Sequence, residues 1–252
     1  MTNLFSIENK IIIVTGGGRG IGQTLSFNLA KNGAIVYSLS KSFSKSVPKN
    51  LPTLFQIKCD INNKKSFNEI CKKIFQKNNS IDVLINNAGI SIPNKNNSIY
   101  PEKNWIQTIQ TNLSASFNSS QTVFLYMKKK KSGSIINITS INAEQGFPNN
   151  PAYIASKGGL KMLTKAFARD WGQYGIRVNN LGPGYFVTDM NKKSYNNSKI
   201  RKSRESMTML GRWGQTKDLV GPCIFLASDA SNYVTGQDIY VDGGWISNGL
   251  PS

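Results

Sequence analysis

The chain has 252 residues, a formal net charge of +18 and no histidine. With 39% hydrophobic residues, this length can bury one sizeable core, so we predict a single domain over residues 1–252. No apolar run approaches the about 20 residues that cross a membrane, and the first residues lack a signal-peptide pattern, so we expect a cytoplasmic protein. Three scattered cysteines are interpreted as reduced, buried thiols, and we expect no metal site.

The positive charge raises the question of a nucleic-acid partner. The lysines are spread among asparagines and isoleucines, and no basic cluster is interleaved with aromatic residues. We therefore interpret the charge as a solvated surface and expect no nucleic-acid partner. The run Lys128–Lys131 suits the end of a helix, where positive side chains interact favourably with the helix dipole.

Apolar, β-branched segments alternate with segments of helical spacing along the chain. Such alternation is typical of a parallel sheet covered on both faces. We predict an α/β fold: a Rossmann-type doubly wound parallel sheet of about seven strands with helices on both faces. Strands are predicted at Lys10–Gly16, Ala34–Ser40, Thr53–Asp60, Ile81–Gly89, Gly133–Ser140, Gly175–Gly184 and Gly236–Gly244. Helices are predicted at Ile21–Lys31, Lys64–Lys77, Asn104–Lys131, Pro151–Tyr174 and Lys217–Ser228.

Two segments interrupt this alternation. Lys41–Pro52 joins the second and third strands and contains two prolines, so the helix that a parallel crossover usually carries is predicted to be short or lost. Asn191–Arg204 is polar and basic, and it follows the sixth strand. A doubly wound sheet places such loops over its ligand, so we predict a mobile substrate loop over about residues 185–212.

The segment "TGGGRGIG" follows the first strand and opens a helix. Glycines let the backbone approach a pyrophosphate, and a helix N-terminus offers free N–H groups. The spacing is GxxxGxG, which differs from the usual GxGxxG fingerprint, and a tight strand-to-helix connection would also explain it. The predicted cofactor contacts here are Thr15, Gly16, Gly18, Arg19, Gly20, Ile21 and Gly22.

The third and fourth strands also end in residues that could face a ligand. Asp60, followed by Ile61, could accept a hydrogen bond from an adenine amino group, or it could cap the next helix. The small residues Asn87, Ala88 and Gly89 would let the chain pass close to a flat ligand, or they could form a tight turn. All five are predicted cofactor contacts.

Tyr153 and Lys157 lie four residues apart, just after a proline that suits the first turn of a helix. The spacing puts both side chains on one helix face. An unperturbed tyrosine has a pKa of about 10, and a neighbouring ammonium lowers that pKa by favouring the phenolate. The pair can thus perform acid–base chemistry without histidine, although an ordinary amphipathic helix would explain the spacing alone.

Six motifs in chain order resemble the short-chain dehydrogenase/reductase family: "TGGGRGIG", "NNAG", "TNLSASF" with Asn112, Ser140, "YIASK", and "GPG" with Thr188. The resemblance spans essentially the whole chain. It implies that Tyr153 is the general acid and base, that Lys157 tunes it and binds the nicotinamide ribose, and that Ser140 hydrogen-bonds the substrate oxygen. It further implies that Asn112 supports a water-linked proton relay. The nicotinamide carboxamide would be held by Pro183, Gly184 and Thr188.

The end of the second strand bears on the choice of cofactor. An acidic residue there would bind the ribose 2′-hydroxyl and repel a 2′-phosphate. Ser40 stands where the family's NAD-selecting aspartate would be, and Lys41 follows it. Lys41, Ser42 and Arg19 could contact a phosphate. We predict NADP(H) as the cofactor, with NAD(H) as the alternative.

The segments "GPGYFVTDMN" and "LGRWGQ" look like the gluconate 5-dehydrogenase branch of the family, although 3-oxoacyl-carrier-protein reductases share much of this region. We predict hydride transfer between nicotinamide and a secondary alcohol or ketone of a sugar acid or related polar sugar. Reduction of a 3-oxoacyl carrier protein, or of a modified or nucleotide-linked sugar, is the alternative. Predicted substrate contacts are Ser140, Asn142, Tyr153 and Tyr185, with Glu144 and Gln145 nearby.

The basic side chains of the substrate loop would attract an anionic substrate, unless they serve only to solvate the loop. They are Lys192, Lys193, Lys199, Arg201, Lys202 and Arg204. The family resemblance also implies a homotetramer, packed two-fold through the helices predicted at Asn104–Lys131 and Pro151–Tyr174.

Overall fold

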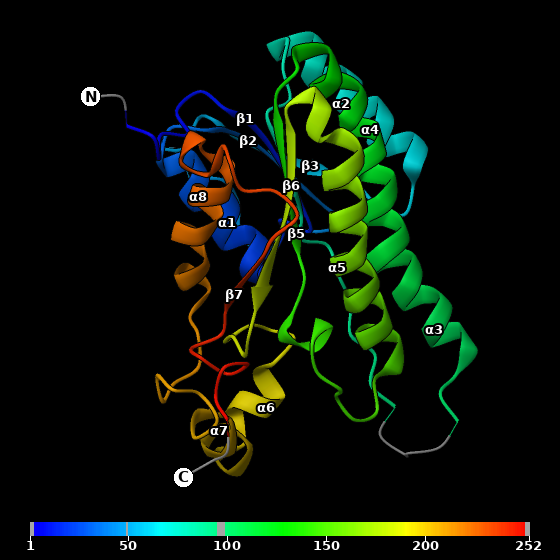
Figure 1. Ribbon diagram of the computed structural model, residues 1–252, viewed down its shortest axis with the longest axis vertical. Coiled ribbons are helices and arrows are strands. Elements are labelled where there is room, and N and C mark those ends of the chain that lie inside the picture. The colour runs from blue at the N-terminus through cyan, green and yellow to red at the C-terminus, as the bar shows by residue number, and fades with distance from the viewer. Residues whose placement is uncertain (1–2, 49, 95–98, 250–252) are drawn as a thin grey trace.

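The computed structural model describes residues 3–48, 50–94 and 99–249. Its centre is a seven-stranded parallel sheet in the order β3-β2-β1-β4-β5-β6-β7. This confirms the predicted Rossmann-type doubly wound sheet (Figure 1). The strands are β1 Ile11–Thr15, β2 Ile35–Ser40, β3 Leu54–Lys58, β4 Val83–Asn86, β5 Gly133–Ile138, β6 Ile176–Pro183 and β7 Asp238–Val241.

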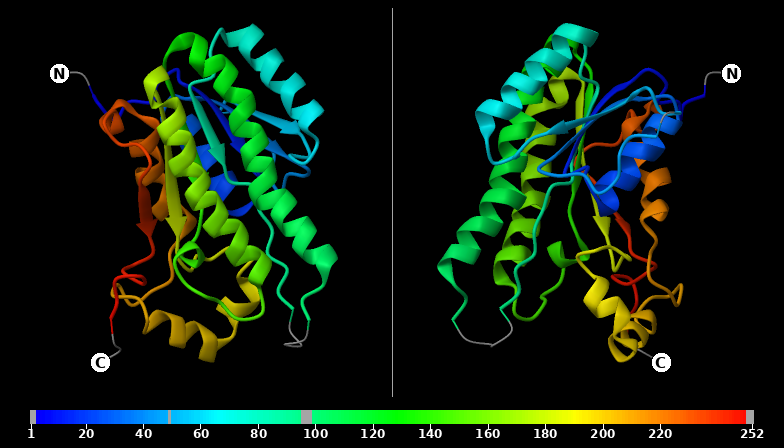
Figure 2. Two further views of the ribbon diagram at one scale, coloured as in Figure 1. Left: turned by 45° about the vertical axis from the view of Figure 1, so that its right-hand side comes forward. Right: turned by 180° about the vertical axis from the view of Figure 1, so that it is seen from behind.

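Helices cover both faces of the sheet, as Figures 1 and 2 show. Two helices, α1 Gly20–Lys31 and α8 Val220–Ala227, contribute to the core on one face. Three others contribute to the core on the opposite face. These are α2 Lys64–Asn78, α4 Ala115–Lys130 and α5 Pro151–Trp171.

The first strand shows how the sequence builds both cores. All five residues of β1 are buried, and successive side chains of a strand point to opposite faces. Ile12 and Val14 join the core that includes α1 and α8, whereas Ile11 and Ile13 join the core that includes α2, α4 and α5. A strand covered on both faces is therefore apolar over a continuous run, here residues 11–14, which is why this pattern predicted a parallel sheet.

The connection from β2 to β3 has no helix in its described residues, 41–48 and 50–53, as predicted. It folds back over the glycine turn instead. The backbone N–H and the hydroxyl of Ser44 both donate to the carbonyl of Gly18, at 3.0 and 3.1 Å. A Cβ on Gly18 would lie 1.9 Å from the carbonyl oxygen of Ser42, so only glycine fits beneath this segment.

The helix predicted at Asn104–Lys131 is not one regular helix. It begins at Glu102 as α3 Glu102–Ile109, passes through a π-helical turn at Gln110–Ser114, and continues as α4. A π turn is rare and occurs often at functional sites. Hydrophobic spacing predicts helix on both sides of Gln110–Ser114, but it does not distinguish a single π turn from regular α-helix.

The basic segment predicted as a loop contains two short helices, α6 Lys192–Asn196 and α7 Ser198–Glu205. They lie beyond the carboxyl ends of the strands (Figures 1 and 2). The side chain of Asn197 caps α7 by accepting the N–H of Ile200 at 3.1 Å. The indole of Trp213 donates to the carbonyl of Arg201 at 3.3 Å. These contacts favour helix in a segment whose own hydrophobic pattern does not predict one.

The predicted helices Pro151–Tyr174 and Lys217–Ser228 each include a short 3-10 turn, at Gly172–Tyr174 and at Thr216–Leu219. Among the described residues, no helix is both long and apolar enough to cross a membrane. The same part of the chain holds no group of three or more acidic, histidine or cysteine side chains suited to a metal ion. The cysteines are free and buried, as predicted: Cys59, Cys71 and Cys223.

Candidate active site

The end of β5 and the start of α5 bring three of the predicted residues together. Ser140 follows β5, and its hydroxyl accepts the N–H of Asn142 at 3.1 Å, which caps a short 3-10 turn. Pro151 occupies the first turn of α5, so Tyr153 and Lys157 lie one turn apart on the helix, as predicted. The side chains of Ser140 and Tyr153 hydrogen-bond to each other.

Lys157 is a buried lysine, with only 4% of its surface exposed. Its ammonium donates to the carbonyl of Ile138, at the end of β5, over 2.7 Å. In the described part of the chain no carboxylate lies within 4 Å of it. Burial lowers the pKa of Lys157 to about 8 because it penalises the charged form.

The electrostatics of Tyr153 differ from the prediction that Lys157 lowers its pKa. Burial raises the pKa of Tyr153, and only the hydrogen bond with Ser140 acts in the opposite direction. The Lys157 ammonium lies 5.6 Å from the centre of the tyrosine ring and is engaged with Ile138. The phenol is therefore protonated at neutral pH.

Asn112 is fully buried in the π turn. Its side-chain oxygen accepts the N–H of Ile90 at 2.8 Å, and its amide nitrogen donates to the carbonyl of Ile90 at 2.9 Å. The amide also donates to the hydroxyl of Ser156, on α5, at 3.0 Å. Asn112 thus joins the segment after β4 to the helix that carries Tyr153 and Lys157.

The glycine turn and the "NNAG" segment are bonded directly to each other. The hydroxyl of Thr15 accepts the N–H groups of Asn87 and Ala88, both at 3.1 Å. The Asn87 amide donates to the carbonyls of Thr15 and Gly16, at 2.9 and 3.1 Å. A Cβ on Gly16 would lie 2.7 Å from the Cα of Ala88, so the two backbones pass too closely for any other residue.

Other predicted cofactor residues gather around the same turn. The start of α1 follows Arg19, which is exposed and provides no side-chain cap. A Cβ on Gly20 would lie 3.8 Å from the Cγ2 of Thr188, so the segment after β6 reaches the glycine turn. A Cβ on Gly184 would meet the Cα of Asp242 at 2.8 Å, which places "GPG" against the end of β7.

The structure pairs Lys41, predicted to bind the 2′-phosphate, with Asp60, predicted to bind the adenine amino group. The ammonium of Lys41 lies 2.8 Å from a carboxylate oxygen of Asp60. Both side chains are largely exposed, so the pair adds little to stability and Lys41 is free to turn. Asp60 does not cap α2, because that position belongs to Asn63, whose side chain accepts the N–H of Ser66.

The predicted substrate side contains an aromatic group that sequence spacing missed. The rings of Tyr185 and Trp213 have centres 5.5 Å apart, and those of Tyr185 and Trp245 are 4.8 Å apart. The indole of Trp245 donates to the side-chain oxygen of Gln145 at 2.8 Å. Glu144 is instead bonded to Lys161 of α5 and to Tyr240 of β7, so it supports the turn after Ser140.

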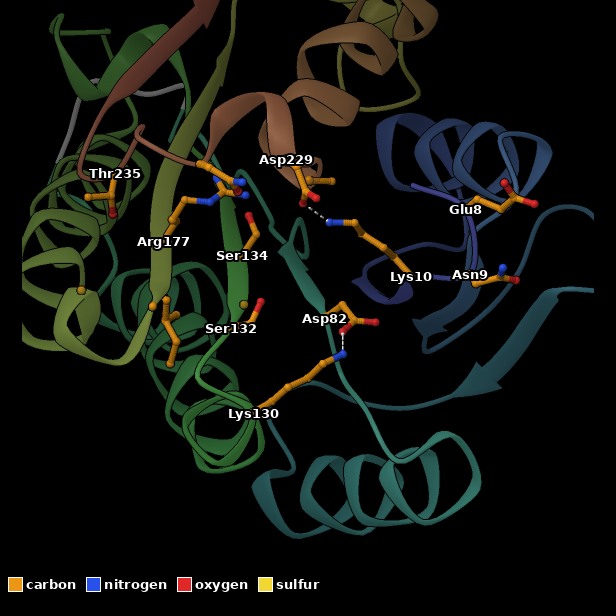
Figure 3. A pocket seen from close by; sticks show the side chains of 16 residues that line it. Glu8, Asn9, Lys10, Asp82, Lys130, Ser132, Ser134, Arg177, Asp229 and Thr235 are labelled. Carbon is orange, nitrogen blue, oxygen red and sulfur yellow. Dashed lines mark hydrogen bonds and ion pairs between the residues drawn. The ribbon is translucent and has the colours of Figure 1, made fainter. Parts of the chain in front are cut away.

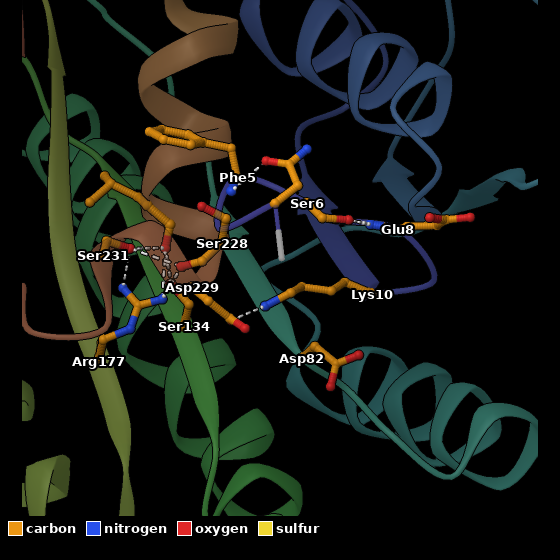
Figure 4. Close-up of polar contacts among 12 residues, drawn as sticks. Phe5, Ser6, Glu8, Lys10, Asp82, Ser134, Arg177, Ser228, Asp229 and Ser231 are labelled. Atoms are coloured by element: carbon orange, nitrogen blue, oxygen red, sulfur yellow. Dashed lines mark hydrogen bonds and ion pairs between the residues drawn. The ribbon is translucent and has the colours of Figure 1, made fainter. Parts of the chain in front are cut away.

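A separate cavity of about 650 Å³ lies at the opposite, amino-terminal edge of the sheet (Figure 3). Two of its lysines form ion pairs: Lys10 with Asp229 at 2.8 Å, and Lys130 with Asp82 at 2.7 Å. The guanidinium of Arg177 donates to the hydroxyl of Ser231 and to the carbonyls of Leu226 and Ser228 (Figure 4). None of the residues that carry the candidate chemistry lines this cavity.

A glycine turn that opens a helix, together with a serine, a tyrosine and a lysine at the carboxyl ends of a parallel sheet, is typical of dinucleotide-dependent oxidoreductases of the Rossmann type. The chain belongs to the short-chain dehydrogenase/reductase family. A family model described as "Enoyl-(Acyl carrier protein) reductase" matches residues 16–246. The family resemblance that the motifs carry is thereby confirmed.

Relatives in this family are similar over nearly the full length. The 2-dehydro-3-deoxy-D-gluconate 5-dehydrogenase of Bacillus subtilis is 38% identical and covers 96% of this chain and 97% of its own. The 3-oxoacyl-(acyl-carrier-protein) reductase of Staphylococcus epidermidis is 36% identical, with coverage of 94% and 98%. A crystal structure of gluconate 5-dehydrogenase from Burkholderia cenocepacia, in complex with NADP and tartrate, has a TM-score of 0.87 at 34% identity and coverage of 97% and 98%.

Proposed function

We propose that the protein transfers a hydride between NADP(H) and a secondary alcohol or ketone of a sugar acid. The observation that carries this proposal is the grouping of Ser140, Tyr153 and Lys157 at the sheet edge where the glycine turn also lies. The B. subtilis and B. cenocepacia relatives are named for gluconate chemistry, which supports this substrate class. Tartrate in the second of these is itself a hydroxy acid.

The residues at the glycine turn fit a dinucleotide. The N-terminus of α1 has no side-chain cap, and its glycines keep the backbone open to a pyrophosphate. Ser40, Lys41 and Arg19 leave the ribose end without an acidic residue at the end of β2, which favours a 2′-phosphate. The proposed contacts are Thr15, Gly16, Gly18, Arg19, Gly20, Ile21, Gly22, Ser40, Lys41, Asp60, Ile61, Asn87, Ala88, Gly89, Tyr153, Lys157, Pro183, Gly184 and Thr188.

NADPH supplies the hydride when it is bound; the chain's own residues position the substrate and move the proton. Ser140 and Tyr153 hold the substrate oxygen by hydrogen bonds. Because burial raises the pKa of Tyr153, its phenol is protonated at neutral pH and donates a proton to that oxygen during reduction. Lys157, with a pKa of about 8, can return a proton to Tyr153 near neutral pH. Asn112 fixes the backbone of Ile90 through its side-chain oxygen. In oxidation Tyr153 accepts the proton instead.

A 3-oxoacyl-carrier-protein reductase is the second candidate, because the S. epidermidis relative carries that name at 36% identity. Its substrate would present an uncharged acyl chain beside Ser140. The side chains near that position are Gln145, Tyr185 and Trp245, which have polar groups as well as rings. A wall of this kind suits hydroxyl groups better than an acyl chain.

We further propose a homotetramer. Large apolar side chains are exposed on α4 and α5, which pack on one face of the sheet, and on α3, which packs on α5. A two-fold contact between copies would cover them. They are Trp105, Ile106, Phe117, Leu125 and Met162.

The test is oxidation of NADPH, with NADH in parallel, against 5-ketogluconate and an uncharged 3-oxoacyl thioester. We expect turnover of 5-ketogluconate, with NADPH preferred. The Lys41→Ala variant should narrow the preference for NADPH roughly tenfold or more, because a charge-assisted bond to phosphate is lost. Turnover of the thioester alone would move the protein to the second candidate.

A further inference from the structure

Arg204, near the end of α7, holds its guanidinium against the aromatic group of the substrate side. The guanidinium carbon lies 4.0 Å from the centre of the Tyr185 ring and 5.4 Å from that of Trp213. The side chain is half-buried, and burial lowers its pKa. Contact with these two rings holds the guanidinium in place through its face and leaves its N–H groups to bind something else.

Nothing in the described part of the chain occupies those N–H groups. No carboxylate lies within 4 Å of Arg204, and it makes no hydrogen bond to the described residues. Its neighbours differ: Arg201 pairs with Glu205 at 3.8 Å, and Arg212 pairs with Asp218 at 2.7 Å. A partly buried cation without an anion is costly unless a ligand supplies the anion.

Aromatic side chains connect Arg204 to the proposed catalytic residues Ser140 and Tyr153. Tyr185, on which it stacks, is close enough to Tyr153 to raise the pKa of that phenol electrostatically. Tyr185 also contacts Trp245, which is bonded to Gln145 on the turn that follows Ser140. One continuous wall therefore runs from Ser140 and Tyr153 to Arg204.

We propose that Arg204 is a specificity-determining residue that binds the carboxylate of the substrate. This inference rests on the proposed function and goes beyond it by naming the side chain that recognises the carboxylate of the sugar acid. A planar guanidinium matches a carboxylate with two parallel hydrogen bonds. The ketone is then held at Ser140 and Tyr153 while the acid end is held at α7, which selects sugar acids over neutral sugars of the same length.

The test compares two ketones that differ only at the end remote from the ketone. The first is 5-keto-D-gluconate, and the second is L-sorbose, in which a hydroxymethyl group replaces the carboxylate. We expect Arg204→Gln to lose roughly tenfold or more in kcat/KM for 5-keto-D-gluconate, mainly through KM, because a charged hydrogen bond is lost. Turnover of L-sorbose should change little. Lys202→Gln, which removes an exposed charge from the same helix, is the matched control.

Equilibrium binding provides a second readout, because Trp213 and Trp245 lie beside the proposed site. In the presence of NADPH, which cannot accept a hydride from an alcohol, titration of tryptophan fluorescence with D-gluconate should give roughly tenfold or more weaker binding for Arg204→Gln. Binding of the neutral D-glucitol should be unchanged, and Arg204→Lys should restore part of the affinity for D-gluconate.

The outcomes separate this inference from the proposed function. Equal losses for both ketones would mean that Arg204 only packs α7, and would overturn the inference. An active wild-type enzyme in which Arg204→Gln behaves like Lys202→Gln would also overturn it, while the proposed function stands. A wild-type enzyme that reduces the thioester and not 5-keto-D-gluconate would overturn the proposed function and the inference together.

Discussion

The two edges of the sheet differ in the partners that their cationic side chains have. At the amino-terminal edge, the cavity is lined by three acidic and three basic side chains, Glu8, Asp82, Asp229, Lys10, Lys130 and Arg177. Lys10 and Lys130 have acidic partners, and Arg177 is bonded to carbonyls and a hydroxyl. At the carboxyl-terminal edge, Lys157 and Arg204 are buried or half-buried without an acidic partner among the described residues.

This difference separates structural from functional charge. The attraction between two paired charges offsets the free energy lost when they leave water, so such a pair can hold elements together without a ligand. A buried cation without an acidic partner lacks this attraction within the chain. Such groups cluster at sites that act on a ligand. The cavity in Figure 3 lies at the edge that carries the structural charges. We expect substitutions at the carboxyl edge to reduce activity, and substitutions at the amino edge to reduce stability.

Tyr153→Phe should produce the largest effect. The variant keeps the ring but loses the proton donor, so turnover should fall by about 10²-fold or more. NADPH binding, measured by its fluorescence on the enzyme, should be retained. Tyr126→Phe, which keeps the ring contact with Phe75 on α2, is the control and should remain fully active. Full turnover by Tyr153→Phe would remove this residue from the proposed mechanism.

Lys157→Met should reduce activity and raise stability. Turnover should fall roughly tenfold or more, because the group that returns a proton to Tyr153 is lost. In the folded wild type the pKa is about 8, below the usual value of 10.5. The unfolded chain therefore binds more protons between these pH values, and wild-type stability should rise by roughly 3 kcal/mol from pH 8 to 10.5.

The Lys157→Met variant should lack that rise with pH. At pH 7 it should be about 2 kcal/mol more stable than wild type, since the removed charge costs more than the lost hydrogen bond to Ile138 contributes. Chemical denaturation at several pH values measures both quantities. An identical pH slope in the two proteins would show that the buried ammonium carries no such cost.

Asp82→Asn should reverse this pattern. Asp82 accepts hydrogen bonds from the N–H of Ile11, from Ser80 and from Lys130. Burial alone would raise its pKa, but these three donors together lower it. We expect a loss of about 1–3 kcal/mol in stability at neutral pH and no loss of turnover.

The stability gap between wild type and Asp82→Asn should shrink as the pH falls below about 4, because the carboxylate of the unfolded chain becomes protonated there while the folded one, with its lowered pKa, stays ionised to lower pH. Lys10→Gln is the control at the same edge. It removes one partner of a more exposed pair and should cost less than about 1 kcal/mol. A large loss of activity in either variant would contradict the division between the two edges.

The sequence predicts the sheet well because residues 11–14 of β1 alternate between two buried faces. Ser140, Tyr153 and Lys157 are predictable because each lies at the end of a strand or in the first turns of a helix, where chain order alone brings them together. The same holds for Gly16 and Ala88, whose backbones meet at adjacent strand ends.

Contacts made by side chains far apart in sequence escape this reasoning. Arg204 appears in the sequence only as one of several basic residues, and its stacking on Tyr185 depends on where α7 folds. Asn191–Arg204 is predicted as a loop because its helices are stabilised by Asn197 and Trp213 and not by an apolar stripe. Glu144 likewise finds its partners, Lys161 and Tyr240, on two other elements.

The π turn at Gln110–Ser114 sets the rotational phase between two helical segments. A residue in an α-helix advances by about 100° around the axis, so one additional residue in a wide turn rotates everything beyond it by that amount. Here α4 packs on the sheet while α3 packs on α5. Deleting one residue from the turn would swing Trp105 and Ile106 away from their present direction. The irregularity that buries Asn112 thus also aims the exposed apolar side chains of α3.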